Sequence, residues 1–332
     1  MNKSSTYSRI DTTTVASLVS CILMEGDRLA IVVVSFNTRE LLLECVSSAT
    51  RYAPGAVIIV VDNASSDGSA GAISRKFPDV RVIENEENVG FGAACNQAIR
   101  SFSSDFYLLL NSDALLTEGT VSALLECMAA NRRAGAAGCL VLDSTGSVSR
   151  TTMLFLTPVN QALELLGLRI SGLTRTHLIK YLTPSCDCSP DWIEASCLMI
   201  RRSAINEIGL FDEQFFMYSE DEDLCWRLKG AGWLVCFTTR ATVTHMGGAS
   251  SGADRSANLI QFYASQIKLL RKHRGPCSAR LFVALTRLAL WLKLFKSRLT
   301  VTAGQSTELR MRSAALKAAG ELLADGPSSG LK

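Results

Sequence analysis

Five short apolar runs alternate with helical segments over the first 150 residues, and this alternation constrains the fold more than any other feature. The runs cover residues 30–35, 56–61, 80–84, 106–110 and 136–142. Continuous apolar runs are typical of strands that are covered on both faces. Strands separated by helices predict a parallel, doubly wound α/β sheet, in which ligands bind outside the carboxyl ends of the strands.

The remainder of the chain departs from this rhythm. Residues 150–190 contain three prolines and predict a long, irregular insertion in a main domain that spans residues 29–251. Residues 1–28 are predicted to form a poorly ordered extension. Residues 252–332 are predicted to form a basic, helical C-terminal extension.

Charge is divided unevenly between the body and this extension. From Arg255 onward there are 14 lysines and arginines against 3 acidic residues, and no acid occurs between Arg255 and Thr307. A basic tail predicts an anionic partner, and the loosely amphipathic segment 278–299 favours a membrane surface. The alternative is a helix packed on the main domain or in a homo-oligomer. Little aromatic interleaving argues against nucleic acid.

The cysteines and the hydropathy of the chain indicate where in the cell the protein works. Eleven scattered cysteines, without regular spacing, favour a reducing environment. No segment reaches the roughly 18 uncharged apolar residues that a membrane span requires. We therefore expect a cytoplasmic protein, held peripherally on the inner face of the cell membrane by its basic tail.

Polar residues follow two of the predicted strands. Asp62 and Asn63 come directly after the second run, and Asn111 and Asp113 after the fourth. Because carboxyl ends of parallel strands share an edge, these side chains are expected at a ligand site. Hydrogen bonding to a nucleotide explains Asp62 better than helix capping does, although capping suits aspartate in general.

A glycine-containing turn precedes the predicted helix near residues 93–101. Asn88, Gly90 and Gly92 lie in this turn. Such glycines permit close approach of the backbone to a phosphate. An ordinary strand-to-helix turn is an equally good interpretation, because the dinucleotide-binding glycine pattern is absent.

Four consecutive acids, Glu220, Asp221, Glu222 and Asp223, follow an aromatic stretch. Ser219 before them predicts a capping box, with Glu222 at its third helical position. Capping does not need all four acids, however. The apolar lead-in implies burial, which raises the pKa of a carboxyl toward the range useful for a general base.

His245 follows a predicted strand over residues 241–244 and is one of three histidines. A lone histidine is usually structural. Together with Asp113, however, it would form a mainly oxygen-based site for Mg²⁺ or Mn²⁺, completed by phosphate oxygens.

The order of these motifs resembles the family 2 inverting glycosyltransferases, and in particular their bacterial rhamnosyltransferase-type branch. The resemblance implies a GT-A fold, which is a Rossmann-like, mostly parallel sheet flanked by helices. It extends over residues 29–251 and is carried by "VVVSFN", "VVDNASSDGS", "NVGFGAACNQAI", "LLLNSDALL", "FDEQFFMYSEDEDLCWRLKGAGW" and "VTHMGG".

The resemblance also implies roles for single residues. Asp62 would recognise the nucleotide base, and Asp113 would bind a divalent metal on the donor diphosphate with help from His245. Asn111 stands where the family's usual metal-binding motif has a second acid. Asp221 best matches the catalytic base, with Glu220 and Asp223 as alternatives; Trp192, Glu194 and Glu220 would lie on the acceptor side.

These roles imply metal-dependent, inverting transfer of a sugar, with rhamnose as first choice, from a nucleotide-diphosphate donor. The acceptor would be lipid-linked or a polysaccharide of the cell envelope. A nucleotidyltransferase is the alternative, but only Arg39 is available as a cation near the first strand. A non-catalytic nucleotide-sugar-binding relative is a third interpretation, which the joint presence of Asp62, Asp113, Asp221 and His245 disfavours.

Overall fold

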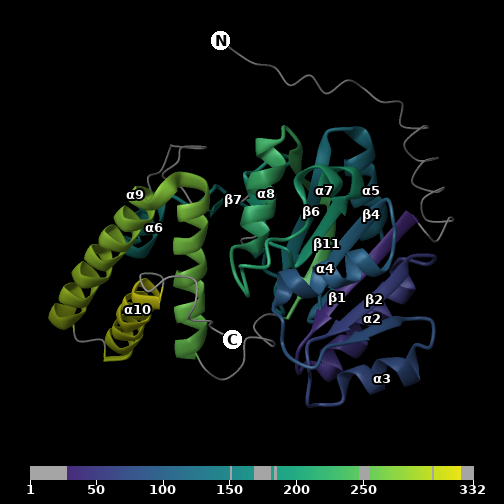
Figure 1. Cartoon of the computed structure of the whole chain (residues 1–332), viewed down its shortest axis with the longest axis horizontal. Helices are drawn as coiled ribbons and strands as arrows, with labels where there is room; N and C mark the ends of the chain where they lie inside the picture. The colour runs from purple at the N-terminus through teal and green to yellow at the C-terminus, as the bar shows by residue number, and fades with distance from the viewer. Residues whose placement is uncertain are drawn as a thin grey trace, which may run out of the picture.

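A computed structural model of the chain describes residues 28–149, 152–167, 181–182, 185–246, 255–300 and 303–322. The predicted N-terminal extension, the two glycines after His245 and the last ten residues lie outside this part. Figure 1 shows a sheet flanked by helices, with two long C-terminal helices beside it.

The central sheet has eight strands in the order β3-β2-β1-β4-β10-β6-β11-β5. Six run parallel to one another, and only β10 and β5 run antiparallel to their neighbours. The prediction of a mostly parallel sheet is confirmed. The β-α alternation alone predicted a fully parallel sheet, and it did not indicate the two antiparallel strands. The strands are β1 (Leu29–Ser35), β2 (Val57–Asp62), β3 (Arg81–Glu84), β4 (Phe106–Asn111), β5 (Ala114–Leu116), β6 (Ala134–Leu142), β10 (Cys197–Arg201) and β11 (Leu234–His245).

Helices bury both faces of this sheet. In β1, Ile31 and Val33 pack in one hydrophobic core, whereas Ala30 and Val32 pack in another. Alternate residues of a strand point to opposite faces, so both faces are covered, as the continuous apolar run predicts. The first core includes residues of α2 (Arg39–Tyr52), α3 (Ser69–Lys76) and α5 (Thr120–Ala130); the second includes residues of α4 (Phe91–Ser101), α7 (Arg202–Ile208) and α8 (Glu220–Gly230).

The sequence of residues 192–201 predicts a single strand, but the structure divides this segment between two sheets. Residues 192–193 form β9 (Trp192–Ile193), which pairs with β7 (Thr152–Met153) in a small three-stranded sheet completed by β8 (Tyr181–Leu182). Residues 197–201 form β10 in the central sheet. The segment between them therefore crosses from one sheet to the other. The strand predicted over residues 241–244 is only the last part of the much longer β11.

The described parts of the predicted irregular insertion contain regular structure. They include β7, β8 and the helix α6 (Pro158–Leu166). Thr157 caps α6 because its side chain accepts a hydrogen bond from the Asn160 backbone N–H, and the Asn160 side chain in turn accepts one from the Thr157 backbone N–H. The prediction of an irregular segment was therefore wrong for these residues.

The C-terminal extension consists of α9 (Arg255–Thr300) and α10 (Ala303–Leu322). Gly275 interrupts α9 with a φ of 81°, directly before Pro276, and divides the helix into two limbs. A third hydrophobic core joins both limbs and α10 to the insertion and to Phe215. The predicted helical extension is confirmed. No helix in the described part of the chain is long and apolar enough to span a membrane.

Candidate active site

The carboxyl ends of three adjacent strands bring the first predicted site residues to one edge of the sheet. The register pairs Ser35 of β1 with Asp62 of β2, and the preceding residue of β1 with Asn111 of β4. The hydroxyl of Thr38 then links the strands, because it lies 3.1 Å from the Ser35 Oγ and donates to the Ser112 Oγ at 2.9 Å. The edge is a continuous polar row, as the sequence predicted.

Asp62 is buried at this edge, and only one of its two carboxylate oxygens has a hydrogen-bond partner within the described residues. Its Oδ2 accepts a hydrogen bond from the backbone of Ser65 at 3.0 Å, while its buried Oδ1 has no partner within the described residues. Helix capping falls instead to Asp67, which accepts from the backbone of Arg39 at the start of α2 and of Ser69 at the start of α3. An unpaired buried carboxylate oxygen is costly, so a ligand donor is the expected partner.

The two glycines of the predicted phosphate turn allow another segment of the chain to pack closely against the turn. Gly90 has a φ of +86°, and a Cβ there would lie 2.2 Å from the backbone oxygen of Phe216. A Cβ on Gly92 would lie 3.1 Å from the Cβ of Phe211. Asn96, which the sequence reasoning missed, exchanges two hydrogen bonds of 3.0 Å with the backbone of Phe211. The turn and α4 therefore fix the loop that leads into α8.

The two predicted donor-binding asparagines near this turn are occupied by protein partners. Asn63 is buried and donates from Nδ2 to the Gly90 oxygen at 3.3 Å. The Asn88 Oδ1 accepts from the Gly90 nitrogen at 3.0 Å. Both side chains thus hold the turn in shape, and a direct contact with a donor stays a prediction.

Asp113 and His245, the two predicted metal ligands, are adjacent. The His245 Nε2 lies 2.9 Å from the Asp113 Oδ1 and 3.3 Å from the Asn111 Nδ2. Pairing of β11 with β5 places His245 opposite Ala114 and so fixes this proximity. The hydrogen bond to buried Asp113 raises the pKa of His245. Within the described residues, no group of three or more histidine, cysteine, aspartate or glutamate side chains converges as a metal site.

The four acids at the start of α8 are all buried, and Ser219 does not cap them. Ser219 has a φ of 66° and its side chain makes no capping hydrogen bond, so the predicted capping box is wrong. The acids bind different partners instead. Glu222, for example, accepts a hydrogen bond of 2.6 Å from the backbone of Leu156.

Asp221 is held by two backbone donors. Its Oδ2 accepts from the Ala195 nitrogen at 3.2 Å and its Oδ1 from the Glu222 nitrogen at 2.8 Å. Burial raises its pKa to about 6, even though these hydrogen bonds act in the opposite direction. Ser196, next to Ala195, accepts from the Asn111 nitrogen at 3.1 Å. Two backbone contacts therefore connect Asp221 to the strand end that carries Asp113.

Two further carboxyls lie beside Asp221. Glu194 keeps contact with solvent, yet partial enclosure by the site and the charge of Asp221 raise its pKa to about 7. The charges of Asp113 and His245 also reach it. Glu220 is buried, and its Oε2 has no partner within the described residues. Burial, together with Asp221 and Glu194, raises the pKa of Glu220 well above its usual range.

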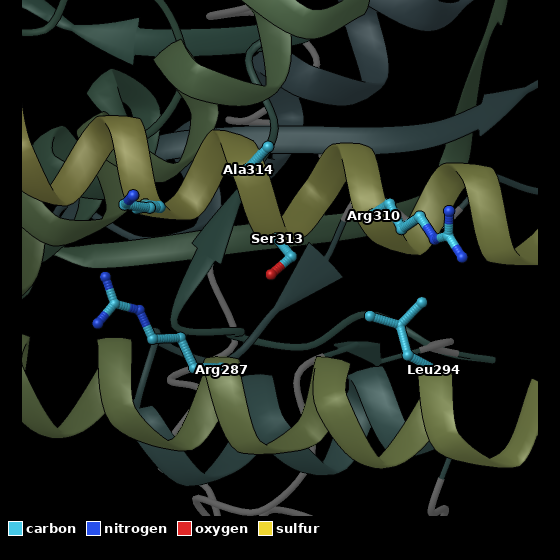
Figure 2. A pocket seen from close by; sticks show the side chains of 6 residues that line it. Arg287, Leu294, Arg310, Ser313 and Ala314 are labelled. Atoms are coloured by element: carbon cyan, nitrogen blue, oxygen red, sulfur yellow. The ribbon is translucent and has the colours of Figure 1, made fainter.

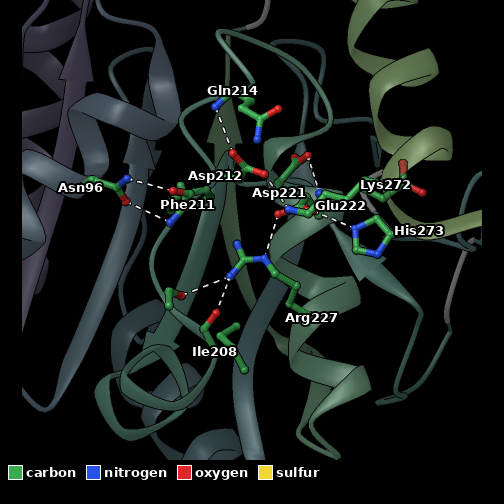
Figure 3. Close-up of polar contacts among 12 residues, drawn as sticks. Asn96, Ile208, Phe211, Asp212, Gln214, Asp221, Glu222, Arg227, Lys272 and His273 are labelled. Carbon is green, nitrogen blue, oxygen red and sulfur yellow. Dashed lines mark hydrogen bonds and ion pairs between the residues drawn. The ribbon is translucent and has the colours of Figure 1, made fainter. Parts of the chain in front are cut away.

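Asp223 has a different role from its neighbours. Its carboxylate is fully buried and contacts three basic side chains. The Oδ1 lies 2.6 Å from the Lys272 Nζ and 2.7 Å from the His273 Nε2, and the Oδ2 lies 2.8 Å from the Arg227 Nε. Burial opposes ionisation, but these contacts lower its pKa to about 2. Figure 3 shows Lys272 and His273 extending from α9 to the first turn of α8. A carboxylate held this way accepts a proton poorly, so its prediction as an alternative base is disfavoured.

Aromatic packing reinforces this junction between α8 and α9. The ring of Trp226 stacks between Phe155, at 4.1 Å, and His273, at 4.5 Å. Sequence reasoning assigned no partner to His273, because nothing local to α9 indicates which segment it contacts. Trp192, predicted on the acceptor side, is buried and donates from Nε1 to the Leu154 oxygen.

Solved structures with a similar fold are sugar transferases of the GT-A class. One is a mannosyltransferase from Pyrobaculum calidifontis in complex with GDP-Man and Mn²⁺, with a TM-score of 0.55 and 15% identity over 93% of this chain and 97% of that chain. Another is GalNAc-T7 with UDP, GalNAc and Mn²⁺, with a TM-score of 0.54 and 14% identity over 74% of this chain and 47% of that one. At such identities the likeness shows the fold.

The family follows from sequence similarity. A model described as Glycosyl transferase family 2 matches residues 30–209, and the chain belongs to this family. An N-acetylglucosaminyl-diphospho-decaprenol L-rhamnosyltransferase from Mycobacterium tuberculosis is 32% identical over 233 residues, covering 66% of this chain and 76% of the relative. Rhamnosyltransferase WbbL from Escherichia coli is 28% identical over 150 residues, covering 43% of this chain and 55% of the relative. The predicted family and enzyme class are confirmed.

Proposed function

We propose that this family 2 glycosyltransferase is an inverting, divalent-metal-dependent enzyme that transfers rhamnose from a nucleotide diphosphate to a lipid-linked acceptor in cell-envelope glycan synthesis. The observation that carries the proposal is the placement of Asp221, a buried carboxyl with a pKa of about 6, next to the strand ends that bear Asp113. The rhamnosyltransferase from Mycobacterium tuberculosis supports the choice of sugar and of acceptor.

The donor would bind along the polar strand ends. The unpaired Oδ1 of Asp62 is an acceptor suited to an N–H group of a nucleotide base. Asp113 and His245 fit a divalent metal, because one carboxylate and one imidazole 2.9 Å apart leave the other positions for diphosphate oxygens. When bound, the metal would neutralise charge on the departing diphosphate.

Asp221 would act on the acceptor. Above a pH of about 6 its carboxylate is ionised and can take the proton of the attacking hydroxyl. The Ala195 and Glu222 backbone N–H groups fix its orientation, and each carboxylate oxygen retains capacity to accept the new proton. One displacement at the anomeric carbon, with a base and no covalent nucleophile, inverts that centre. Glu194, at the solvent side of Asp221, is suited to contact acceptor hydroxyls.

A lipid-linked acceptor would place the reaction at a membrane surface. We therefore propose a cytoplasmic enzyme that works peripherally on the inner face of the cell membrane.

The test is a donor panel with the full chain. Deoxythymidine-diphosphate rhamnose, GDP-mannose and UDP-N-acetylglucosamine are each incubated with a prenyl-diphosphate N-acetylglucosamine acceptor, with Mn²⁺, Mg²⁺ or a chelator. We expect metal-dependent release of nucleoside diphosphate with the rhamnose donor, and a product whose anomeric configuration is inverted relative to the donor. Preference for another donor would overturn the choice of sugar, and a retained configuration would overturn the mechanism.

A further inference from the structure

The second limb of α9 exposes an apolar face that the proposed active site does not use. Its largest exposed side chains include Leu288 (52%), Trp291 (59%) and Phe295 (54%). Leu281 and Leu292 extend the same side of the helix, since all five recur at spacings of three, four or seven. Trp291 and Phe295 stack on each other, with ring centroids 5.8 Å apart. A contiguous exposed apolar patch of this kind marks an interaction surface.

The opposite side of this limb is already packed. Phe282, Thr286 and Leu290 are fully buried, and Phe282 and Leu290 belong to the core that the extension shares with α10. The core of the extension is therefore built from the other side of this limb, and the exposed apolar side chains are not part of it. At 100° per residue, Arg280 and Arg287 lie along one border of the apolar face and Lys296 along the other. An apolar strip framed by cations is typical of a helix that lies in a membrane interface.

A cationic groove adjoins this face. Arg287 and Leu294 of α9 face Arg310, Ser313, Ala314 and Lys317 of α10 across a cavity of about 480 Å³. Figure 2 shows the guanidinium groups of Arg287 and Arg310 toward opposite ends of the groove, with the Ser313 hydroxyl directed into the space between the two helices. The lining residues include three cations and one hydroxyl donor, and one of the cations, Lys317, also makes an exposed ion pair with Glu321 at 3.8 Å; this positive lining suits anionic headgroups.

Arg287 links the two features, because it borders the apolar face and also lines the groove. We propose that the second limb of α9 and α10 together form a membrane-docking element. The groove binds the headgroup phosphate of an anionic phospholipid, and Leu288, Trp291 and Phe295 enter the interface beside it. Aromatic side chains are enriched at this depth of a bilayer, and cations near it are attracted to anionic lipids.

Charge favours a lipid surface over a second copy of the chain. An isologous contact through this face would set Arg280, Arg287 and Lys296 of one copy near the same cations of the other. In the first limb of α9, by contrast, Lys272 makes ion pairs with Asp212 and Asp223 within the chain. The docking role therefore belongs to the second limb and α10, which narrows the broader prediction for the whole basic tail.

The experiment is vesicle flotation of the full chain with phosphatidylcholine alone or with about 30% phosphatidylglycerol, which gives the vesicles a negative surface potential. The variant R287Q/R310Q removes two groove cations, and W291A/F295A removes the aromatic pair. R75Q/K76Q is the matched control, because it removes two exposed cations on α3, away from the extension.

We expect the full chain to float with the anionic vesicles. R287Q/R310Q should weaken that binding about tenfold or more, since each cation near an anionic surface contributes to it, and the control should change it less than about twofold. W291A/F295A should weaken binding to a similar extent. In vesicles containing brominated lipid, the fluorescence of the native chain should be quenched more than that of Trp291→Phe.

Other outcomes overturn the docking element. Equal binding by all variants, or binding that ignores phosphatidylglycerol, would refute it. A change from dimer to monomer in W291A/F295A, with vesicle binding retained, would identify the face as a subunit contact. Retention of a prenyl diphosphate but not of phosphatidylglycerol would assign the groove to the acceptor. Metal-dependent donor hydrolysis by the same variants should stay near the native rate, so its failure would report on the proposed function instead.

Discussion

The carboxylate of Asp223 joins α8 to α9, and its replacement by asparagine tests the strength of that junction. Its pKa falls from 3.8 to about 2, which corresponds to about 2 kcal/mol of native-state stability at neutral pH. Asp223→Asn keeps the shape of the buried side chain but leaves the partly exposed Lys272, His273 and Arg227 facing a neutral amide. We expect the free energy of unfolding to fall by about 2–4 kcal/mol, since removing one member of a buried pair is strongly destabilising.

Urea denaturation at pH 7, followed by circular dichroism and by tryptophan fluorescence, measures this loss. Glu126→Gln is the control, because Glu126 makes an ion pair with Arg240 in which the two side chains are 37% and 54% exposed. Such an exposed pair contributes at most about 1 kcal/mol. A depressed carboxyl pKa stabilises the native state above pH 3.8, and this contribution is lost as the pH falls toward 2. The free energies of unfolding of the native chain and of Asp223→Asn should therefore converge as the pH falls toward 2. Equal free energies of unfolding for these two proteins at pH 7 would refute the reasoning.

Three more predictions concern the site itself. The rate of sugar transfer should rise with pH through about 6, because burial raises the pKa of the Asp221 base to that value; a flat profile between pH 5 and 8 would exclude it. Gly90→Ala should lower stability in thermal denaturation by more than the roughly 1–2 kcal/mol expected of Gly68→Ala. Both have positive φ, but only at Gly90 would the new methyl group collide with backbone. Asp113→Asn and His245→Ala should each weaken Mn²⁺-dependent donor binding in calorimetry by more than the roughly tenfold typical of losing an outer-shell partner; unchanged metal titrations would remove both from the metal site.

The local hydrophobic pattern of the sequence was enough to predict the strands of the first half of the sheet. The runs that became β1, β2 and β4 are continuous because both faces are buried, and polar residues at their ends lie at one edge for a topological reason. The position of Asp62, Asp113 and His245 could be anticipated on that basis. The pattern predicted a strand over residues that include β10, but it could not reveal that β10 enters the sheet antiparallel between β4 and β6, because that pairing joins segments far apart in the sequence.

The acidic cluster shows the same limit at the level of single residues. Sequence placed four acids at the start of a helix, but their roles depend on distant partners. Asp221 meets the backbone of Ala195, whereas Asp223 meets Lys272 and His273 from α9. The pKa of one is therefore raised and that of the other lowered, although the two are only two residues apart. Helical periodicity likewise could not show that the first limb of α9 packs against α8, whereas the second limb exposes an apolar face.

The most direct measurement compares Asp221→Asn with Glu194→Gln in single-turnover transfer and in donor binding. If Asp221 is the base, its replacement should lower the rate by about 10²–10⁴-fold, the range typical of a general base, and leave donor affinity unchanged. Glu194→Gln should retain most of the rate, because in our proposal Glu194 contacts acceptor hydroxyls and does not take the proton. Retained transfer by Asp221→Asn, or an equal loss of donor binding, would contradict the account.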